Sequence, residues 1–179
     1  CGELGADLTL TETFLAIGVD ELIYYMFSDR HRQKPDPDRR YDRIYIGGDY
    51  GQQNATTFEA FGLDRYRKRF PGLGEYYHSG RESGRQKSPS EYARDLVEFM
   101  NDLHEQYDNR GFYIFLDPSA KGLAEEVRRA TRAENLDYQV FLRDAENDVA
   151  LGISRVQKVL SFDIMTTSPK QEYAVSEFG

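Results

Sequence analysis

Apolar and aromatic residues in the first half of the chain form stretches that suit β-strands. Three such stretches, at residues 42–50, 56–63 and 74–78, are separated by short links rich in glycine, asparagine or proline. On the second stretch, Phe58, Ala60 and Gly62 share one face. Links this short favour an antiparallel meander, with Pro71-Gly72 as the turn before the third strand.

At Ser88 the apolar period changes to that of a helix. Ser88, Pro89 and Glu91 match an N-terminal capping box with proline at the first helical position. The spacing predicts a helix to about residue 108 with one apolar stripe, formed by Tyr92, Leu96, Phe99, Met100 and Leu103.

Strands and helices alternate in the second half. Residues 111–116 are apolar without alternation, which predicts a strand buried on both faces. The elements expected after it are a helix capped by Ser119, a strand at 138–142, a helix that begins at Asp148, and a last strand at 162–165. This order predicts an α/β fold of the ribonuclease H-like kind, a mixed sheet in which a three-strand meander is followed by alternating helices and strands, flanked by helices.

The first 40 residues are expected to be an N-terminal extension or linker, and residues 41–179 the main domain. Residues 22–27 form an apolar run that suits a buried strand, whereas residues 30–40 are charged and contain two prolines. With 179 residues, of which 39% are hydrophobic, the chain is long enough for one domain with a proper core.

Composition excludes several classes of protein. No apolar run approaches 18 residues and no signal-peptide pattern opens the chain, so no membrane association is expected. The single cysteine, Cys1, excludes an internal disulfide and a cysteine zinc cluster, and fits a reducing cytosol. The net charge of −8 argues against coating nucleic acid through bulk charge. Residues 28–87 nevertheless hold 13 Lys and Arg against 9 Asp and Glu, so a positive face towards DNA and a solvated mixed surface both remain open.

Two aspartates are the candidate chemical groups. Asp49 leaves the first strand between Gly47-Gly48 and Gly51, and Asp117 ends the strand at 111–116, directly before a helix. If these strands are neighbours, the two carboxylates lie side by side, and a divalent cation between them would relieve their repulsion. Mg²⁺ or Mn²⁺ suits such oxygen ligands, and two ions would support phosphodiester hydrolysis.

Simpler interpretations stay open for each of these groups. Asp49 also fits a solvated hairpin turn, and Asp117 a capping residue in an Asp-Pro-Ser turn. His78 is a possible ligand or proton carrier, although an ordinary sheet histidine is the better interpretation. A basic set could hold DNA phosphates or form a solvated surface: Arg65, Arg67, Lys68, Arg69, Arg81, Arg85 and Lys87.

Three segments together resemble the C-terminal nuclease domain of tailed-phage terminase large subunits. They are Tyr45 to Phe58 (YIGGDYGQQNATTF), Phe115 to Ala120 (FLDPSA) and Asp148 to Val156 (DVALGISRV). The resemblance implies that Asp49 and Asp117 are catalytic ligands of two Mg²⁺ or Mn²⁺ ions. The family's third acid lies in a His-x-x-Asp segment beyond Gly179, so the domain is expected to be truncated at its C-terminus. By position alone, Asp144, Glu146 and Asp148 are alternatives, although Asp148 is more simply a helix N-cap.

The resemblance also implies a function, a setting and partners. It predicts an endonuclease that cuts concatemeric double-stranded DNA in the cytoplasm of the bacterial host, at the procapsid, together with a portal protein and a small terminase subunit. The phosphate-binding pattern G-x-x-x-x-G-K-[ST] is absent from the sequence, so the family's packaging ATPase is not in this chain.

Other functions fit parts of the same pattern. A docking module of the packaging motor with vestigial acids would need no third ligand. Asp49-x-Gly51 followed by Thr56-Thr57 also resembles the phosphate-binding hairpin of actin-like ATPases and sugar kinases, but no second D-x-G follows residue 110. Resolvases and transposases share the fold, although the segment at 148–156 has no known counterpart in them.

Overall fold

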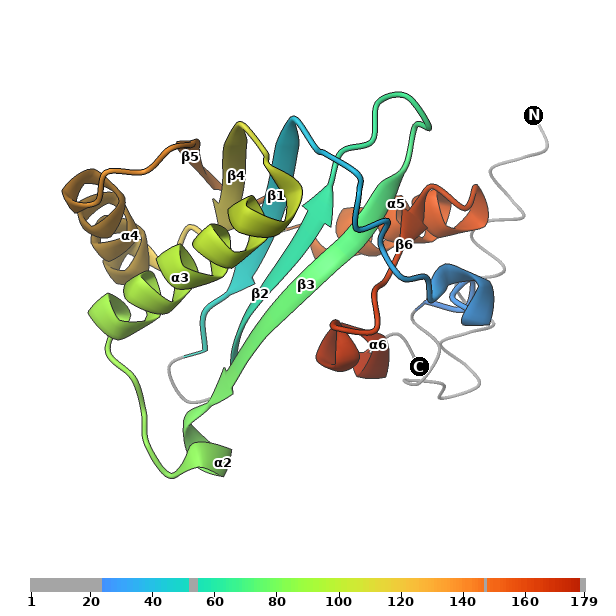
Figure 1. Cartoon of the computed structure of the whole chain (residues 1–179). Coiled ribbons are helices and arrows are strands. Elements are labelled where there is room, and N and C mark those ends of the chain that lie inside the picture. Colours follow the sequence, from blue (N-terminus) through green and yellow to red (C-terminus); the bar gives the residue numbers. More distant parts are fainter. Residues whose placement is uncertain (1–23, 52–54, 147, 178–179) are drawn as a thin grey trace.

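The computed structural model describes residues 24–51, 55–146 and 148–177 and shows one mixed sheet between two layers of helices. Helices α3 and α4 lie on one side of the sheet, which we call the first face, and α5 and α6 lie on the other side, the second face (Figure 1). The strands are β1 (Arg43–Asp49), β2 (Ala55–Gly62), β3 (Phe70–Ser79), β4 (Gly111–Leu116), β5 (Gln139–Asp144) and β6 (Met165–Thr166).

The sheet has the order β5-β4-β1-β2-β3-β6. Strands β1, β2 and β3 form the predicted antiparallel meander, and β4 pairs in parallel with both β1 and β5. The helices are η1 (Asp29–His31, a 3-10 helix), α2 (Gly80–Ser83), α3 (Pro89–Tyr107), α4 (Lys121–Ala133), α5 (Val149–Ser161) and α6 (Glu172–Glu177).

The hydrophobic core fills the space between the first face and helices α3 and α4. Alternate residues of β1 and β4 point into it, among them Ile44, Ile46 and Ile114, all fully buried. Helix α3 begins as predicted, since the Ser88 side chain accepts from the Glu91 N–H and the Glu91 carboxylate accepts from the Ser88 N–H. Its apolar stripe closes the core, so the predicted helix is confirmed in place and orientation.

One predicted turn and one predicted helix cap are wrong. Pro71-Gly72 lies inside β3 rather than in a turn, because β3 begins at Phe70 and continues through a bulge opposite Ala60 and Phe61. Helix α4 is capped by Ala120, which offers no side-chain acceptor, and Ser119 belongs to the preceding turn.

The strand at 111–116 is also not buried on both faces. Its burial alternates, with Phe112, Ile114 and Leu116 in the core and Tyr113 and Phe115 half-buried on the second face. Aromatic rings occupy both sides of this strand, so its sequence shows no alternation even though its two faces have different surroundings.

The N-terminal part that the structure describes packs on the second-face side of the domain. Residues 24–27 form a turn instead of the strand that their apolar run suggested, and residues 22–23 lie outside the described part. His31 is fully buried and its Nε2 lies 2.9 Å from the Leu160 carbonyl at the end of α5. Backbone hydrogen bonds join His31 and Gln33 to Thr167, so residues 28–33 of the expected linker contact the domain directly.

Candidate active site

Asp49 and Asp117 lie at the same edge of the sheet. Asp49 is the last residue of β1, and Asp117 follows directly after β4. The two strands run parallel with Gly48 opposite Leu116, so each aspartate comes one residue after this pair. The expected neighbourhood of the two strands is therefore confirmed. Strand alternation places the Asp49 side chain on the second face, together with Tyr45 and Gly47.

The two carboxyl groups have different surroundings. Asp49 is exposed, whereas Asp117 is half-buried and its Oδ1 accepts a hydrogen bond from the Ser119 N–H at 2.6 Å. That bond orients the Asp117 carboxylate in the turn between β4 and α4. A carboxylate has about four lone-pair sites, so a turn-forming role is compatible with binding a cation as well.

The two glycines before Asp49 face opposite sides of the sheet. A Cβ atom at Gly48 would lie 2.5 Å from Leu116 Cδ2 and 3.0 Å from Phe58 Cδ1, because this residue faces the core. A Cβ atom at Gly47 would have nothing within 4 Å, because Gly47 faces the exposed second face beside Asp49. The backbone at Gly47 is therefore open to an approaching group.

Further carboxylates lie near Asp117, at the end of β5 and the start of α5. Asp117, Glu146 and Asp148 line a hollow of about 520 Å³ whose wall includes Ile153 of α5. Asp148 is the α5 N-cap, as predicted, since its Oδ1 accepts from the Leu151 N–H. Glu146 pairs with Arg155 at 2.5 Å. These contacts give both acids structural roles.

The acids do not form a complete metal site within the described ranges. No group of three or more His, Cys, Asp or Glu side chains that could hold a metal is found there. Asp49 and Asp117 offer the hard oxygen donors that Mg²⁺ and Mn²⁺ prefer, so their chemistry fits these ions. At least one further ligand would be needed to complete the site.

An aromatic ladder lies on the second face, beside the two aspartates. The Tyr113 ring stacks between Phe141 of β5 and Tyr45 of β1, with ring centroids 4.7 and 5.4 Å apart. Phe115 stacks on Tyr45 at 6.3 Å, and the Arg43 guanidinium lies over the Tyr113 ring at 5.1 Å. The ladder was not predicted from the sequence, although Tyr113 and Phe115 have the spacing of one strand face.

A half-buried carboxyl pair lies on the same face, farther from the edge. Glu59 of β2 and Glu75 of β3 are directly opposite each other. Gln171 donates to Glu59 Oε2 at 2.9 Å, while Glu75 accepts from the backbone N–H groups of Tyr173 and Ala174 at the start of α6. Burial, and a hydrogen bond that the protonated group shares with Glu75, raise the pKa of Glu59 to about 9. Glu59 is therefore protonated at neutral pH.

His78 lies at the Asp49 end of the sheet but on the first face, opposite to the face that carries the Asp49 side chain. It projects from β3 towards α3, where its Nδ1 is 2.9 Å from the Tyr92 hydroxyl and its Nε2 is 3.2 Å from Ser83 Oγ. Both ring nitrogens are thus within hydrogen-bond reach of hydroxyl groups. These contacts favour the interpretation of His78 as an ordinary sheet histidine.

The structure divides the predicted basic set between two ends of the sheet. Residues 81–87 lie at the Asp49 end, because β3 ends there, and two of their cations are neutralised. Arg85 pairs with Glu91, and Lys87 pairs with Asp95 at 2.6 Å. Residues 65–69 form the β2–β3 turn at the opposite end, next to the start of β1, where the Leu63 N–H donates to the Arg43 carbonyl.

Solved structures of terminases resemble this chain. The large terminase of a thermophilic bacteriophage superposes with a TM-score of 0.73 and 30% identity, covering 88% of this chain and 36% of that one. The predicted resemblance is confirmed. The chain is similar to terminase large subunits, and it spans about a third of the length of that phage protein. No protein-family model and no curated sequence matches it.

Two terminase nuclease domains have the same fold at lower identity. The nuclease domain of the P22 large terminase gives a TM-score of 0.61 with 11% identity, covering 89% of this chain and 78% of that one. The human cytomegalovirus terminase nuclease domain, soaked with Mn and with an inhibitor bound, gives 0.59 with 16% identity, covering 79% and 72%. These likenesses confirm the ribonuclease H-like fold of this terminase-like chain. No described helix is both long enough and apolar enough to cross a bilayer.

Proposed function

We propose that this chain carries the endonuclease site of a viral DNA-packaging terminase, with Asp49 and Asp117 as ligands of divalent metal ions. The observation that supports the proposal most is the position of the two acids at one edge of the sheet, on neighbouring parallel strands. Their order and spacing occur in a chain that is 30% identical to a phage large terminase. Fold likeness alone would not support a catalytic role.

In the proposed site, Asp49 and Asp117 would supply carboxylate ligands to two Mg²⁺ or Mn²⁺ ions. Ions held in this way would activate a water molecule and stabilise the leaving oxygen during hydrolysis of a phosphodiester bond. The chain itself positions the oxygen ligands on rigid strand ends and leaves open space at Gly47 for the substrate backbone. We expect the third carboxylate to come from residues beyond 179 of a longer protein.

The proposed substrate is concatemeric double-stranded DNA. The proposed partners are a portal protein and a small terminase subunit, and the proposed place of action is the procapsid in the host cytoplasm. These partners and this setting rest on the resemblance to terminases.

Plasmid nicking in Mn²⁺ and Mg²⁺ tests the proposal. We compare this chain, a longer polypeptide that continues past Gly179, and its Asp49→Asn and Asp117→Asn variants. Asp42→Asn is the matched control, because Asp42 is an exposed aspartate at the other end of β1. We expect the longer polypeptide to nick DNA, each site variant to lose at least about 100-fold, and the control to retain full activity.

A docking module is the second candidate, because the described residues hold no complete metal site. An inert longer polypeptide that still binds portal or small terminase would favour it over the nuclease. If the 179-residue chain already nicks DNA and Asp148→Ala abolishes nicking, the third ligand lies within this chain and the proposed ligand set is wrong.

A further inference from the structure

The β2–β3 turn is an exposed, strongly basic loop at the end of the sheet opposite Asp49. We call residues Asp64 to Arg69 (DRYRKR) the basic turn. Residues 65–69 are all exposed, and Tyr66, at 90% exposure, is more accessible than Tyr25, Leu151 or Phe162, the other large hydrophobic residues exposed in the described part. Because β1 has seven residues, the basic turn lies about 23 Å from the carboxylate edge.

A buried carboxylate holds the basic turn in one shape. Asp64 is only 4% exposed, and its Oδ1 accepts from the Arg67 N–H at 2.9 Å and from the Arg39 guanidinium at 2.5 Å. Burial alone would raise the pKa of Asp64, but these hydrogen bonds keep it below its ordinary value. The backbones of Asp64 and Arg69 exchange two hydrogen bonds of 3.0 Å. The loop is therefore fixed at its base, and its side chains are free to point outwards.

The backbone of the basic turn is strained at its tip. Lys68 has a φ of 53°, in the left-handed region that glycine and asparagine occupy at lower cost. A turn selected for stability alone would carry one of those residues here. Strained positions of this kind concentrate at binding sites, where the surrounding structure holds them in place.

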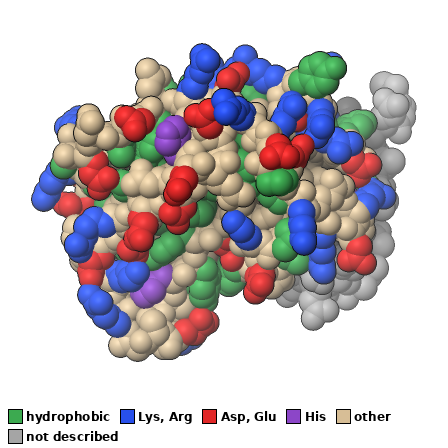
Figure 2. All heavy atoms as spheres, in the orientation of Figure 1, with side chains coloured by type: hydrophobic (Ala, Val, Ile, Leu, Met, Phe, Trp, Pro, Cys, Tyr) green, Lys and Arg blue, Asp and Glu red, His purple; other side chains and the backbone are tan. Residues whose placement is uncertain are grey.

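The positive charge of the basic turn is largely unneutralised. Among the described residues, no carboxylate lies within 4.0 Å of the charged groups of Arg65, Lys68 or Arg69, and Arg67 reaches Asp36 only at 4.0 Å. At the other end of the sheet, Arg85 and Lys87 are both paired. Figure 2 shows Lys and Arg side chains gathered over the end of the molecule that carries the β2–β3 turn.

We infer that the basic turn binds the sugar-phosphate backbone of DNA at a place separate from the cleavage site. Closely spaced cations fixed on a rigid loop suit the regular phosphate spacing of a nucleic acid, and an aromatic ring between arginines can cover a sugar or a base. A duplex that follows β1 from the carboxylate edge to this turn would extend over about seven base pairs. The choice of DNA as the ligand rests on the proposed function, whereas the binding surface does not.

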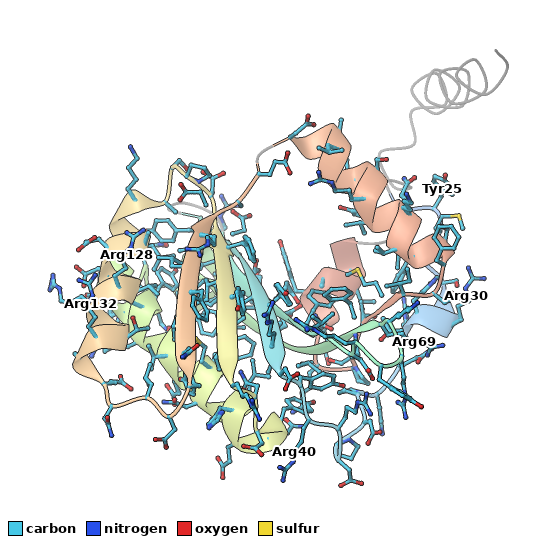
Figure 3. The ribbon with its side chains drawn as sticks, turned by 90° about the horizontal axis from the view of Figure 1, so that it is seen from above. Tyr25, Arg30, Arg40, Arg69, Arg128 and Arg132 are labelled. Carbon is cyan, nitrogen blue, oxygen red and sulfur yellow. The ribbon has the colours of Figure 1, made fainter. Side chains whose placement is uncertain are left out.

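Binding without metal tests this inference independently of cleavage. Fluorescence anisotropy in EDTA measures the affinity for a labelled duplex of about 30 base pairs and for its single strand. The variant R65Q/K68Q/R69Q changes only exposed side chains of the basic turn. Its matched control is R128Q/R129Q/R132Q, which removes three exposed charges from α4; Figure 3 shows Arg128 and Arg132 pointing outwards from this helix.

We expect the basic-turn variant to lose at least tenfold in duplex affinity at about 100 mM salt, with a decrease of about 2.7 in the slope of log K against log salt concentration. The α4 control should lose less than threefold. Equal losses in both variants, or wild-type binding by the basic-turn variant, would overturn the inference. Displacement of the duplex by polyglutamate at equal charge concentration would also overturn it, because the surface would then bind acidic protein.

Two further variants define the ligand. Tyr66→Ala should weaken single-strand binding more than duplex binding if the ring stacks on bases, and both equally if it covers the backbone. Glu98→Gln, a change at an exposed residue of α3 outside both sites, should bind DNA with wild-type affinity in EDTA. A longer polypeptide that continues past Gly179, binds through the basic turn and never nicks DNA would disprove the proposed nuclease and leave this inference standing.

Discussion

The two faces of the sheet belong to the same strands but carry different kinds of side chain. The first face presents fully buried aliphatic and aromatic side chains to α3 and α4, and its packing leaves no room for a Cβ atom at Gly48. The second face carries half-buried stacked rings, an open backbone at Gly47, two edge aspartates and the half-buried pair Glu59 and Glu75.

This difference separates stability from chemistry within one sheet. Apolar burial on the first face stabilises the fold without exposing any reactive group. Polar and ionisable groups on the second face cost free energy to bury, and they can bind a ligand or react with it. Substitutions at neighbouring positions of one strand should therefore have very different effects, depending on the face.

The largest effect expected of a single substitution is at Ile114, and Phe115 beside it provides the comparison. Ile114 is fully buried on the first face, whereas Phe115 is half-buried on the second. We expect Ile114→Ala to lower the free energy of unfolding by about 3–4 kcal/mol, and Phe115→Ala by about 1–2 kcal/mol although it removes more atoms. Urea denaturation measures both. A larger loss for Phe115→Ala would show that the second face also belongs to the stabilising core.

A pH-dependent difference is expected for Glu59. Its folded-state pKa of about 9 is higher than the ordinary value, so the folded state holds a proton that the unfolded state releases from about pH 4.5 upwards. Wild-type stability should therefore fall between about pH 5 and pH 9, by up to about 1.4 kcal/mol per pH unit.

Glu59→Gln keeps an amide donor facing Glu75 and removes the titrating proton. The fall in stability with pH should be largely absent from this variant and unchanged in Glu98→Gln, an exposed control on α3. Thermal unfolding at several pH values measures this dependence of stability on pH. Equal slopes in wild type and Glu59→Gln would show that Glu59 is already ionised in the folded protein.

The adjacent glycines are expected to respond to substitution with opposite signs. A methyl group at Gly48 would meet Leu116 and Phe58, both fixed in the core, so Gly48→Ala should cost about 2 kcal/mol. Gly47→Ala meets open space and removes glycine's extra backbone entropy in a strand, so it should raise stability by about 0.5 kcal/mol. Denaturation midpoints measure the change in the free energy of unfolding for each variant. A change of the same sign in both variants would contradict the contrast between the two faces.

Local sequence signals were sufficient for the elements whose cause is local. The Ser88-Pro89 start of α3 and the Asp148 cap of α5 follow from side-chain hydrogen bonds within one turn, and the neighbouring positions of Asp49 and Asp117 follow from strand order. The bulge that keeps Pro71 in β3 depends on pairing with distant residues, so no local signal could show it.

The surroundings of the site were also beyond local reasoning. Alternation along β4 was concealed because Tyr113 and Phe115 are as apolar as the core residues beside them. The basic residues at 65–69 and 81–87 are close in sequence, yet β3 separates them by its ten-residue length. Charge counting along the chain could not place them at opposite ends of the sheet.

Paramagnetic broadening by Mn²⁺ in the NMR spectrum of the folded chain measures whether Asp49 and Asp117 together hold a divalent metal ion. We predict that low Mn²⁺ concentrations broaden the amide signals of Gly47, Gly48 and Asp117 first. Asp49→Asn should abolish this broadening, and Asp42→Asn should not. Broadening centred on Glu146 and Asp148, and unchanged by Asp49→Asn, would contradict the account.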